Sequence, residues 1–417
     1  MPKLLINSGI RLDGTIDVQG AKNSLLPILA ASLMGSGKSV IHNCPRLSDT
    51  QAATEILEEL GCKTDFSNGT VYIDAGDAYK WEIPDNLMRK MRSSIVFLGA
   101  ILGKFRKAKV SLPGGCELGP RPIDIHIEAL RKMGVSVKDE YGYLYCECPK
   151  GLKGASIDLR LPSVGATENI MLCACCAEGT TVINNAAREP EIVDLQSFLV
   201  KMGAKITGAG TDTIIIEGVK KLNCAEHSVM PDRIVTATYL MCAAATGGRV
   251  KLCKTKYTDL SAVLSAMSDA GCRFKLYNDS IELLNAPVPK ALNTVRTMPF
   301  PGFPTDAQAL LCAYLTVATG TSIIVETVFQ SRYKYIQELA RMGAKIRTED
   351  RLAIIDGVKY LTGSSVEATD LRGGAALVIA GLMAKGTTQI DKIFHIERGY
   401  ENIEYALSSL GADIKKI

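Results

Sequence analysis

The clearest pattern along the chain is a segment that is apolar nearly all round and rich in small residues. Each copy ends in glycine and runs into a β-rich stretch. Such a segment predicts a helix that is buried on every side, because no face of it is polar. Six copies occur: SLLPILAASLMGSGKSVIHN, SIVFLGAILGKFRKAKVSL, NIMLCACCAEGTTVINN, VTATYLMCAAATGGRVKLC, ALLCAYLTVATGTSIIVE and ALVIAGLMAKGTTQIDKI.

A second helical pattern follows each of these segments and has a polar face, as in TEILEELG and IQELARMG. It therefore predicts a helix that is half exposed. Each copy ends at a glycine that is followed by a strand-like run, and a glycine with positive φ is typical of a helix C-terminus. The six glycines are Gly61, Gly134, Gly203, Gly271, Gly343 and Gly411, spaced 73, 69, 68, 72 and 68 residues apart.

These patterns predict six copies of one unit of about 70 residues, each with a buried helix, a strand, a half-exposed helix and further strands. One unit cannot cover its own apolar helix, whereas three units packed around their three helices can. The alternation of helices and strands therefore predicts an α/β fold (α+β by some schemes) with two similar three-unit domains. The division falls near Met230.

Composition narrows the class of protein. The 417 residues are 47% hydrophobic and 22% charged, and the net charge of +4 is too mild to indicate a nucleic-acid surface. Most of the 13 cysteines lie in apolar runs, which predicts small buried residues in a reduced protein without a zinc site. No export signal and no apolar run long enough for a membrane span are present, so the sequence predicts a cytosolic protein.

The starts of the buried helices are polar, unlike their bodies. Three parallel helices would bring three N-termini together, where partial positive charge and free N–H groups attract anions. Cations at a helix N-terminus oppose the helix dipole, so Lys22 and Arg92 favour an anion-binding role. For Ser24, Thr305 and Asn169 helix capping is the simpler interpretation.

Basic residues also stand before the second helix of several units. These are Arg46, Arg121, Arg332 and Arg398. One arginine is usually a solvated surface residue, but four at one repeat position favour ligand contact, which we expect for the last three.

The stretch LPGGCELGPRPIDIH at residues 112–126 has no counterpart in the other units. Its glycines and prolines predict a loop with mobile joints, suited to a lid. Cys116 lies among glycines near Arg121 and His126, and those cations favour its thiolate. The alternative is a loop cysteine without a chemical role.

Distinctive motifs occur along essentially the whole chain: AKNSLLP, MRSSIVFLGA, PGGCELGPRPIDIH, PSVGATENI, AAREPEIVD, PDRI, FPTDAQA, ATDLRGGAALV and HIERGYENIE. With these motifs the chain resembles the enolpyruvyl transferases, and within them the UDP-N-acetylglucosamine 1-carboxyvinyltransferases (MurA). This resemblance implies two inside-out α/β domains, residues 21–229 and residues 1–20 plus 230–417, with the active site in the cleft between them.

The resemblance also implies the reaction. The enolpyruvyl group of phosphoenolpyruvate moves to the 3-hydroxyl of UDP-N-acetylglucosamine through a tetrahedral intermediate, and phosphate leaves. This is the first committed step of peptidoglycan synthesis. No metal or organic cofactor, nucleic acid or membrane is implied, and a cytoplasmic monomer is expected. The thiolate of Cys116 further implies alkylation by fosfomycin.

Site residues carry over by position. The implied catalytic residues are Cys116 as general acid, Asp306 as the base for the sugar hydroxyl, Lys22 and Arg398. Phosphoenolpyruvate binding is implied for Lys22, Asn23, Arg92, Arg121, Arg332, Arg372 and Arg398. UDP-N-acetylglucosamine binding is implied for Asn23, Arg92, Arg121, Pro122, Ile123, Asp124, Ile125, Ser163, Val164, Gly165, Asp306 and Val328. His126 and Asp370 are expected to support the site.

One position departs from the family pattern. Some members have a lysine where this chain has Leu161, so a backbone N–H or Lys153 is expected to take over the diphosphate contact. Taken from the residues alone, Asp306 could also be a helix cap. A shikimate-type enolpyruvyl transferase, a nucleic-acid-binding repeat clamp and a catalytically silent paralogue remain alternatives.

Overall fold

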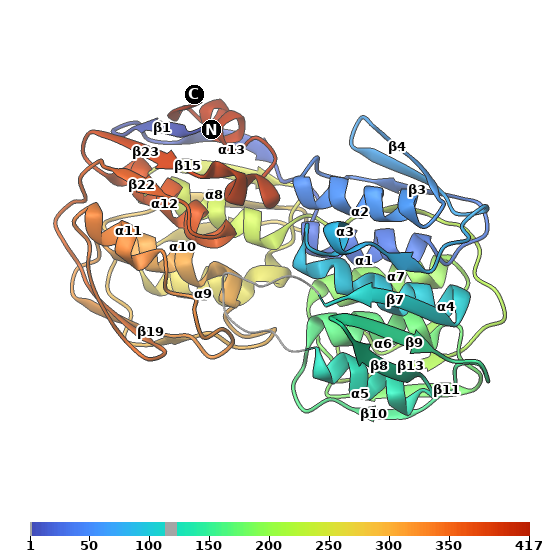
Figure 1. Cartoon of the computed structure of the whole chain (residues 1–417). Coiled ribbons are helices and arrows are strands. Elements are labelled where there is room, and N and C mark those ends of the chain that lie inside the picture. The colour runs from blue at the N-terminus through green and yellow to red at the C-terminus, as the bar shows by residue number, and fades with distance from the viewer. Residues whose placement is uncertain (1, 113–122) are drawn as a thin grey trace. The chain divides into compact units, whose positions relative to one another are not determined.

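The computed structural model describes residues 2–112 and 123–417, which form two compact units (Figure 1). Among the described residues, unit 1 comprises 2–19 and 231–417, and unit 2 comprises 20–112 and 123–230. Each unit has its own hydrophobic core. Among the described residues, the chain crosses between the units at Gln19–Gly20 and Met230–Pro231. Each crossing lies one residue away from the boundary that the resemblance implied.

Unit 2 contains the first three repeats. Its buried helices are α1 (Lys22–Ser32), α4 (Phe97–Phe105), which continues the 3-10 helix η1 (Arg92–Val96), and α6 (Val164–Ala174). Helices with a polar face are α2 (Ser48–Glu59), α5 (Asp124–Lys132) and α7 (Pro190–Lys201), and α3 (Asp85–Met88) is a single turn. The sheet strands are β3 (Lys38–His42), β4 (Lys63–Ser67), β5 (Thr70–Asp74), β6 (Glu82–Ile83), β7 (Lys107–Ser111), β8 (Ser136–Glu140), β9 (Tyr143–Glu147), β10 (Ser156–Asp158), β11 (Thr180–Asn184), β12 (Lys205–Thr207), β13 (Thr213–Glu217) and β14 (Glu226–Ser228).

Unit 1 contains the other three repeats. Its buried helices α8 (Arg233–Ala245), α10 (Thr305–Leu315) and α12 (Leu371–Met383) pack against one another. The outer helices are α9 (Ser261–Asp269), α11 (Ile336–Arg341) and α13 (Ile403–Ser409), with 3-10 helices η2 (Tyr257–Leu260) and η3 (Ile393–Arg398). The strands are β1 (Leu4–Asn7), β2 (Asp13–Asp17), β15 (Arg249–Cys253), β16 (Arg273–Leu276), β17 (Ser280–Asn285), β18 (Val295–Arg296), β19 (Thr321–Val325), β20 (Lys345–Glu349), β21 (Leu352–Asp356), β22 (Ser365–Glu367), β23 (Thr387–Asp391) and β24 (Asp413–Lys416).

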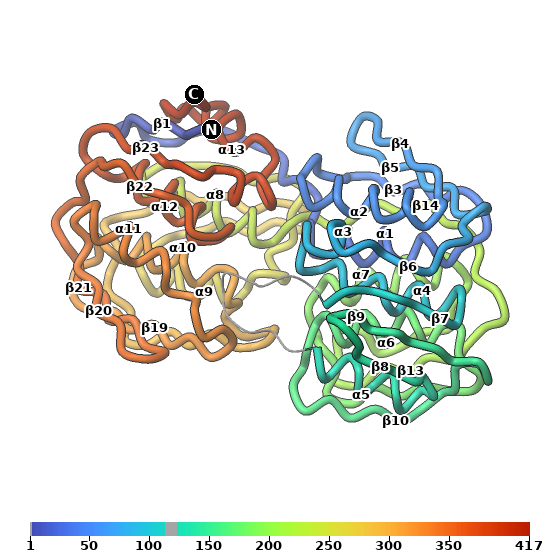
Figure 2. The backbone as a smooth tube through the Cα atoms, in the orientation of Figure 1, coloured from blue at the N-terminus to red at the C-terminus, as the bar shows by residue number. Residues whose placement is uncertain are grey.

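The described strands form six four-stranded sheets, three in each unit, and every sheet has one parallel and two antiparallel strand pairs. β1 lies between β23 and β24, so the N- and C-terminal ends of the chain lie side by side in unit 1 (Figure 2). This mixed α/β fold of small sheets around buried helices confirms the predicted fold class.

The repeat glycines confirm the predicted helix ends. All six have positive φ, between 89° and 109°, directly after a half-exposed helix. A left-handed residue there closes the helix and turns the chain into the next strand, and glycine adopts this conformation without strain.

The twelve cysteines in the described part of the chain are free, and most are buried. Burial raises the pKa of Cys44, Cys146 and Cys312 to about 12, which makes these thiols inert at neutral pH. Across residues 2–112 and 123–417, no group of three metal-ligating side chains is present. None of the described helices has the length and apolarity that crossing a membrane requires.

Candidate active site

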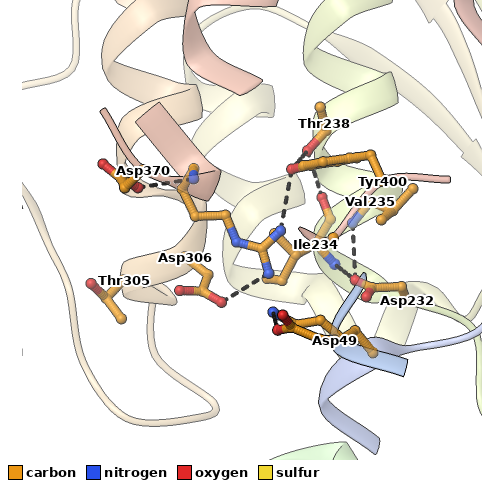
Figure 3. Close-up of polar contacts among 12 residues, drawn as sticks. Asp49, Asp232, Ile234, Val235, Thr238, Thr305, Asp306, Asp370 and Tyr400 are labelled. Carbon is orange, nitrogen blue, oxygen red and sulfur yellow. Dashed lines mark hydrogen bonds and ion pairs between the residues drawn. The ribbon is translucent and has the colours of Figure 1, made fainter. Parts of the chain in front are cut away.

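Asp306 lies between two buried arginines of unit 1 at the start of α10. Its Oδ1 accepts a hydrogen bond from Arg332 Nη2 at 2.9 Å, and its Oδ2 accepts one from Arg372 Nη2 at 3.0 Å. The arginine side chains are only 2% and 4% exposed, whereas Asp306 is 28% exposed. We call these three residues the Asp306 cluster. Figure 3 shows Asp306 and Tyr400 on opposite sides of one guanidinium group, with Asp370 at the backbone end of the same side chain.

Both arginines of the Asp306 cluster have spare hydrogen-bonding capacity. The buried Nε atoms of Arg332 and Arg372 have no hydrogen-bond partner among the described atoms. A buried donor without a partner is costly, and a guanidinium group suits the planar geometry of a carboxylate or phosphate. The cluster can therefore bind an anionic ligand while Asp306 remains solvent accessible.

Arg372 is fixed at both its ends. Asp370 Oδ1 accepts hydrogen bonds from the backbone N–H groups of Arg372 at 2.9 Å and Gly373 at 3.1 Å, so Asp370 caps α12. Arg372 Nη1 donates to the Tyr400 hydroxyl at 3.2 Å. Burial alone would lower the pKa of Arg372. The negative charge of Asp306, and next the contact with Tyr400, outweigh this effect and hold the pKa above its ordinary value, so the guanidinium stays charged.

Glu326, directly after β19, shapes the loop beside the Asp306 cluster. This carboxylate is 1% exposed, and its Oε1 accepts from the backbone N–H groups of Val328 at 2.8 Å and Phe329 at 3.0 Å. Its Oε2 accepts from the Thr305 hydroxyl at 2.8 Å. Glu326 thereby ties the loop of Val328, whose side chain is exposed, to the start of α10. Nothing in the sequence pattern distinguishes Glu326, because it simply follows an apolar strand.

At the start of α8, Asp232 Oδ1 accepts from the backbone N–H groups of Ile234 and Val235 at 2.9 and 3.0 Å, and the next residue, Arg233, is buried. Arg398 is half-buried in η3.

In unit 2, the first residue of α1 is a buried cation. Lys22 is 8% exposed, and its Nζ lies 3.3 Å from Oδ2 of the buried Asp49 on α2. Asn23 follows on α1 and is half-buried. The carboxylate of Asp49 compensates the cation at the helix N-terminus, and no local sequence pattern indicated this partner.

A second polar group in unit 2 joins α4, α5 and α6. Asn169 Oδ1 accepts from the backbone N–H of Gly99 at 2.6 Å, and Asn169 Nδ2 lies 2.9 Å from His126 Nδ1. A Cβ atom at Gly165 would lie 3.2 Å from His126 Cε1, so glycine permits this approach. His126 therefore packs against the first turns of α6.

His126 is neutral in the folded protein. Burial, and next the positive charge of Arg92, lower the pKa of His126 from 6.5 to about 4. Since an amide nitrogen can only donate, Nδ1 accepts from Asn169, which assigns the ring proton to Nε2. Protonation of Nδ1 would remove that hydrogen bond and place a charge near Arg92.

This predicts a loss of stability on the acid side. Because the pKa is lower in the folded than in the unfolded state, the unfolded chain binds more protons, and stability falls as the pH drops from about 6.5 to about 4 by on the order of 3 kcal/mol. In His126→Asn, the amide oxygen can replace Nδ1 as acceptor and does not titrate. Thermal unfolding midpoints measured over this pH range should fall less steeply in this variant. His42→Asn, at a half-exposed histidine of the same unit, is the control, and an unchanged slope in His126→Asn would contradict the assignment.

The other predicted nucleotide-binding residues lie at the starts of α5 and α6. Ser163 Oγ accepts from the Ala166 N–H at 3.4 Å and caps α6, while Val164 and Gly165 form its first turn. Ile123 precedes α5, Asp124 opens it beside Arg160, and Ile125 follows. Leu161 is exposed, and Lys153 pairs with Glu178 on the surface. Cys116, Arg121 and Pro122 lie outside the described residues.

The simple capping interpretation was wrong at three positions. The Ser24 hydroxyl donates to Asp194 Oδ2 at 2.5 Å, the Thr305 hydroxyl donates to Glu326, and Asn169 bonds across helices. The N-cap residues of α1 and α10 are Ala21 and Pro304. Neither side chain can accept a hydrogen bond, so no side chain caps these two helices at the N-cap position. Asp306 likewise does not cap α10, because its carboxylate is paired with the two arginines.

The chain matches a known protein family over nearly its whole length. The family described as EPSP synthase (3-phosphoshikimate 1-carboxyvinyltransferase) matches residues 6–407. The UDP-N-acetylglucosamine 1-carboxyvinyltransferase 2 of Caldanaerobacter subterraneus subsp. tengcongensis is 54% identical over 417 residues, which is 100% of both chains. The chain belongs to the UDP-N-acetylglucosamine 1-carboxyvinyltransferases, within the enolpyruvyl transferase family.

Other relatives agree with this placement. The UDP-N-acetylglucosamine 1-carboxyvinyltransferase 1 of Symbiobacterium thermophilum is 46% identical over 100% of this chain and 95% of its own. The crystal structure of the enolpyruvyl transferase NikO from Streptomyces tendae superposes with a TM-score of 0.88 at 25% identity, covering 100% of this chain and 98% of that one. EPSP synthase from Acinetobacter baumannii has a TM-score of 0.77 at 17% identity, covering 100% of both chains, and shows the shared fold. The resemblance inferred from the sequence is therefore confirmed.

Proposed function

We propose that this chain transfers the enolpyruvyl group of phosphoenolpyruvate to the 3-hydroxyl of UDP-N-acetylglucosamine and releases phosphate. The names of relatives at 46–54% identity over the whole chain support this reaction and its place in peptidoglycan synthesis. The observation that carries the chemistry is the Asp306 cluster, in which a partly exposed carboxylate lies between two buried guanidinium groups whose Nε atoms lack partners.

The substrate is a dianion or trianion with a phosphate and a carboxylate, so it needs several fixed cations. Arg332 and Arg372 supply two of them in unit 1, and Lys22 and Arg92 begin buried segments in unit 2. We assign phosphoenolpyruvate binding to these four residues together with Asn23, Arg121 and Arg398. Fixed cations also stabilise the charge of a tetrahedral intermediate better than reorganising water does.

The reaction balances as an addition followed by an elimination. The sugar 3-oxygen bonds to C2 of phosphoenolpyruvate, a proton is added to the methylene carbon, and the hydroxyl proton leaves. A proton then leaves the methyl carbon, the C2–O bond to phosphate breaks, and the double bond is restored. We assign Asp306 as the acceptor of the hydroxyl proton. An anionic substrate that takes over hydrogen bonds from Arg332 and Arg372 would release the carboxylate for this task.

The resemblance supports Cys116 as the proton donor to the methylene carbon, and a cytoplasmic monomer without metal, organic cofactor or nucleic acid as the working form. UDP-N-acetylglucosamine binding is assigned to the starts of α5 and α6, with Asp306 and Val328 from unit 1.

A second candidate acceptor is shikimate 3-phosphate, because the family that matches residues 6–407 is described by that activity. Release of inorganic phosphate from phosphoenolpyruvate, measured with each acceptor separately, distinguishes them. Release with UDP-N-acetylglucosamine only is expected. Release only with shikimate 3-phosphate would overturn the proposal.

A further inference from the structure

The hydroxyl group of Tyr400 lies between the guanidinium of Arg372 and the hydroxyl of Thr238. Arg372 Nη1 is 3.2 Å from the Tyr400 oxygen, and the Thr238 oxygen is 2.8 Å from it on the other side. Thr238 Oγ1 also lies 2.8 Å from the carbonyl oxygen of Ile234, one turn earlier in α8. Figure 3 shows these contacts as one continuous chain from α12 through Tyr400 to α8.

The order of the protons in this chain follows from its two ends. A guanidinium nitrogen can only donate, and a carbonyl oxygen can only accept. If Thr238 donates its single proton to Ile234 O, Tyr400 must donate to Thr238, and the Tyr400 oxygen is then left to accept from Arg372. In the reverse order the buried Tyr400 proton would lack a partner among the described atoms. Only the first order gives both hydroxyl protons, those of Tyr400 and Thr238, an acceptor.

The protonation states agree with this order. Burial raises the pKa of Tyr400, and this effect exceeds the opposing influence of Arg372 and Thr238, so the phenol keeps its proton. Tyr400 is 1% exposed, so water does not compete for its hydroxyl. The tyrosine therefore has one fixed role toward Arg372, that of acceptor.

We propose that Tyr400 is a positioning residue for Arg372, which directs the guanidinium edge bearing Nη2 and the unpartnered Nε toward the phosphoenolpyruvate anion. The proposal rests on the proposed function of the Asp306 cluster. With Nη1 bonded to Tyr400 and Nη2 bonded to Asp306, the guanidinium is held in one orientation, and less ordering is needed when the substrate binds. Nothing in the sequence pattern distinguished Tyr400 from an ordinary core tyrosine.

The test compares Tyr400→Phe with Tyr314→Phe. Tyr314 is a fully buried tyrosine near the other end of α10, where its hydroxyl contacts Cys272 Sγ at 3.4 Å. Loss of the acceptor leaves Nη1 of a buried cation unpaired, so KM for phosphoenolpyruvate should rise about tenfold in Tyr400→Phe. KM for UDP-N-acetylglucosamine should change less than about twofold, and Tyr314→Phe should change neither constant. Thermal midpoints of both variants separate loss of folding from loss of positioning.

A second pair of variants tests the proton order. Thr238→Val removes the group that accepts from Tyr400, while Thr238→Ser retains it, so KM for phosphoenolpyruvate should rise in the valine variant only. An unchanged KM in Tyr400→Phe, or a rise equal to that in Tyr314→Phe, would overturn the positioning role. Failure of the proposed function would look different, since the wild-type protein itself would then release no phosphate with UDP-N-acetylglucosamine.

Discussion

Asp306→Asn is expected to reduce kcat about a thousandfold while phosphoenolpyruvate still binds. The amide cannot accept the proton of the sugar hydroxyl, and positioned general bases contribute on the order of 10²- to 10⁴-fold. The same change removes a negative charge from between Arg332 and Arg372, so the dissociation constant of phosphoenolpyruvate should stay the same or fall. Steady-state phosphate release gives kcat, and titration calorimetry gives the dissociation constant.

The control for this variant is Asp356→Asn, in another carboxylate of unit 1. Asp356 accepts from the Thr321 hydroxyl at 2.7 Å and pairs with Arg347 at the surface. It should leave kcat within about twofold of wild type, as surface substitutions usually do. If Asp306→Asn retained wild-type kcat, Asp306 would not be the base. Weaker phosphoenolpyruvate binding without a change in kcat would instead assign Asp306 a structural role.

Arg372→Lys is expected to lower kcat/KM for phosphoenolpyruvate at least about a hundredfold, which corresponds to about 3 kcal/mol. Lysine keeps the charge, but its three donors share one nitrogen. It therefore lacks the planar fork with which Arg372 contacts Tyr400 and Asp306 from two separate nitrogens. KM for UDP-N-acetylglucosamine should change much less. Initial rates at varied phosphoenolpyruvate, with the other substrate saturating, give the comparison.

Arg347→Lys is the matched control, since Arg347 is 69% exposed and lies 3.6 Å from Asp356. It should be kinetically silent, because exposed ion pairs contribute little. Equal kinetics for Arg372→Lys and wild type would show that only the charge of Arg372 matters and that the planar geometry of the guanidinium in the Asp306 cluster does not.

Local patterns in the sequence predicted the repeat well. A helix that is apolar all round must be buried, so the six buried helices could be predicted from their own residues. A glycine directly after an amphipathic helix closes that helix, so the positive φ of the six repeat glycines could be predicted in the same way. The polar start of α10 also singled out Asp306, although its role came from the family resemblance.

The partners of these residues could not be predicted in the same way. Asp306 meets Arg372 across 66 residues of sequence, and Ser24 meets Asp194 across 170, so only the packed unit brings them together. The capping interpretation of Ser24, Thr305 and Asn169 was wrong for the same reason: each side chain bonds to a residue distant in the sequence and not to the backbone N–H groups of its own helix. Glu326 and Tyr400 could not be singled out from the sequence. Glu326 resembles a polar residue that ends a strand, and Tyr400 resembles an ordinary core tyrosine; only their hydrogen bonds in the folded unit distinguish them.

The most direct test of the account supplies phosphoenolpyruvate, UDP-N-acetylglucosamine and shikimate 3-phosphate together to the purified protein and identifies the products by mass spectrometry. We expect UDP-N-acetylglucosamine alone to gain an enolpyruvyl group, in an amount equal to the phosphate released. Transfer to shikimate 3-phosphate, or phosphate release without any enolpyruvyl product, would contradict the account.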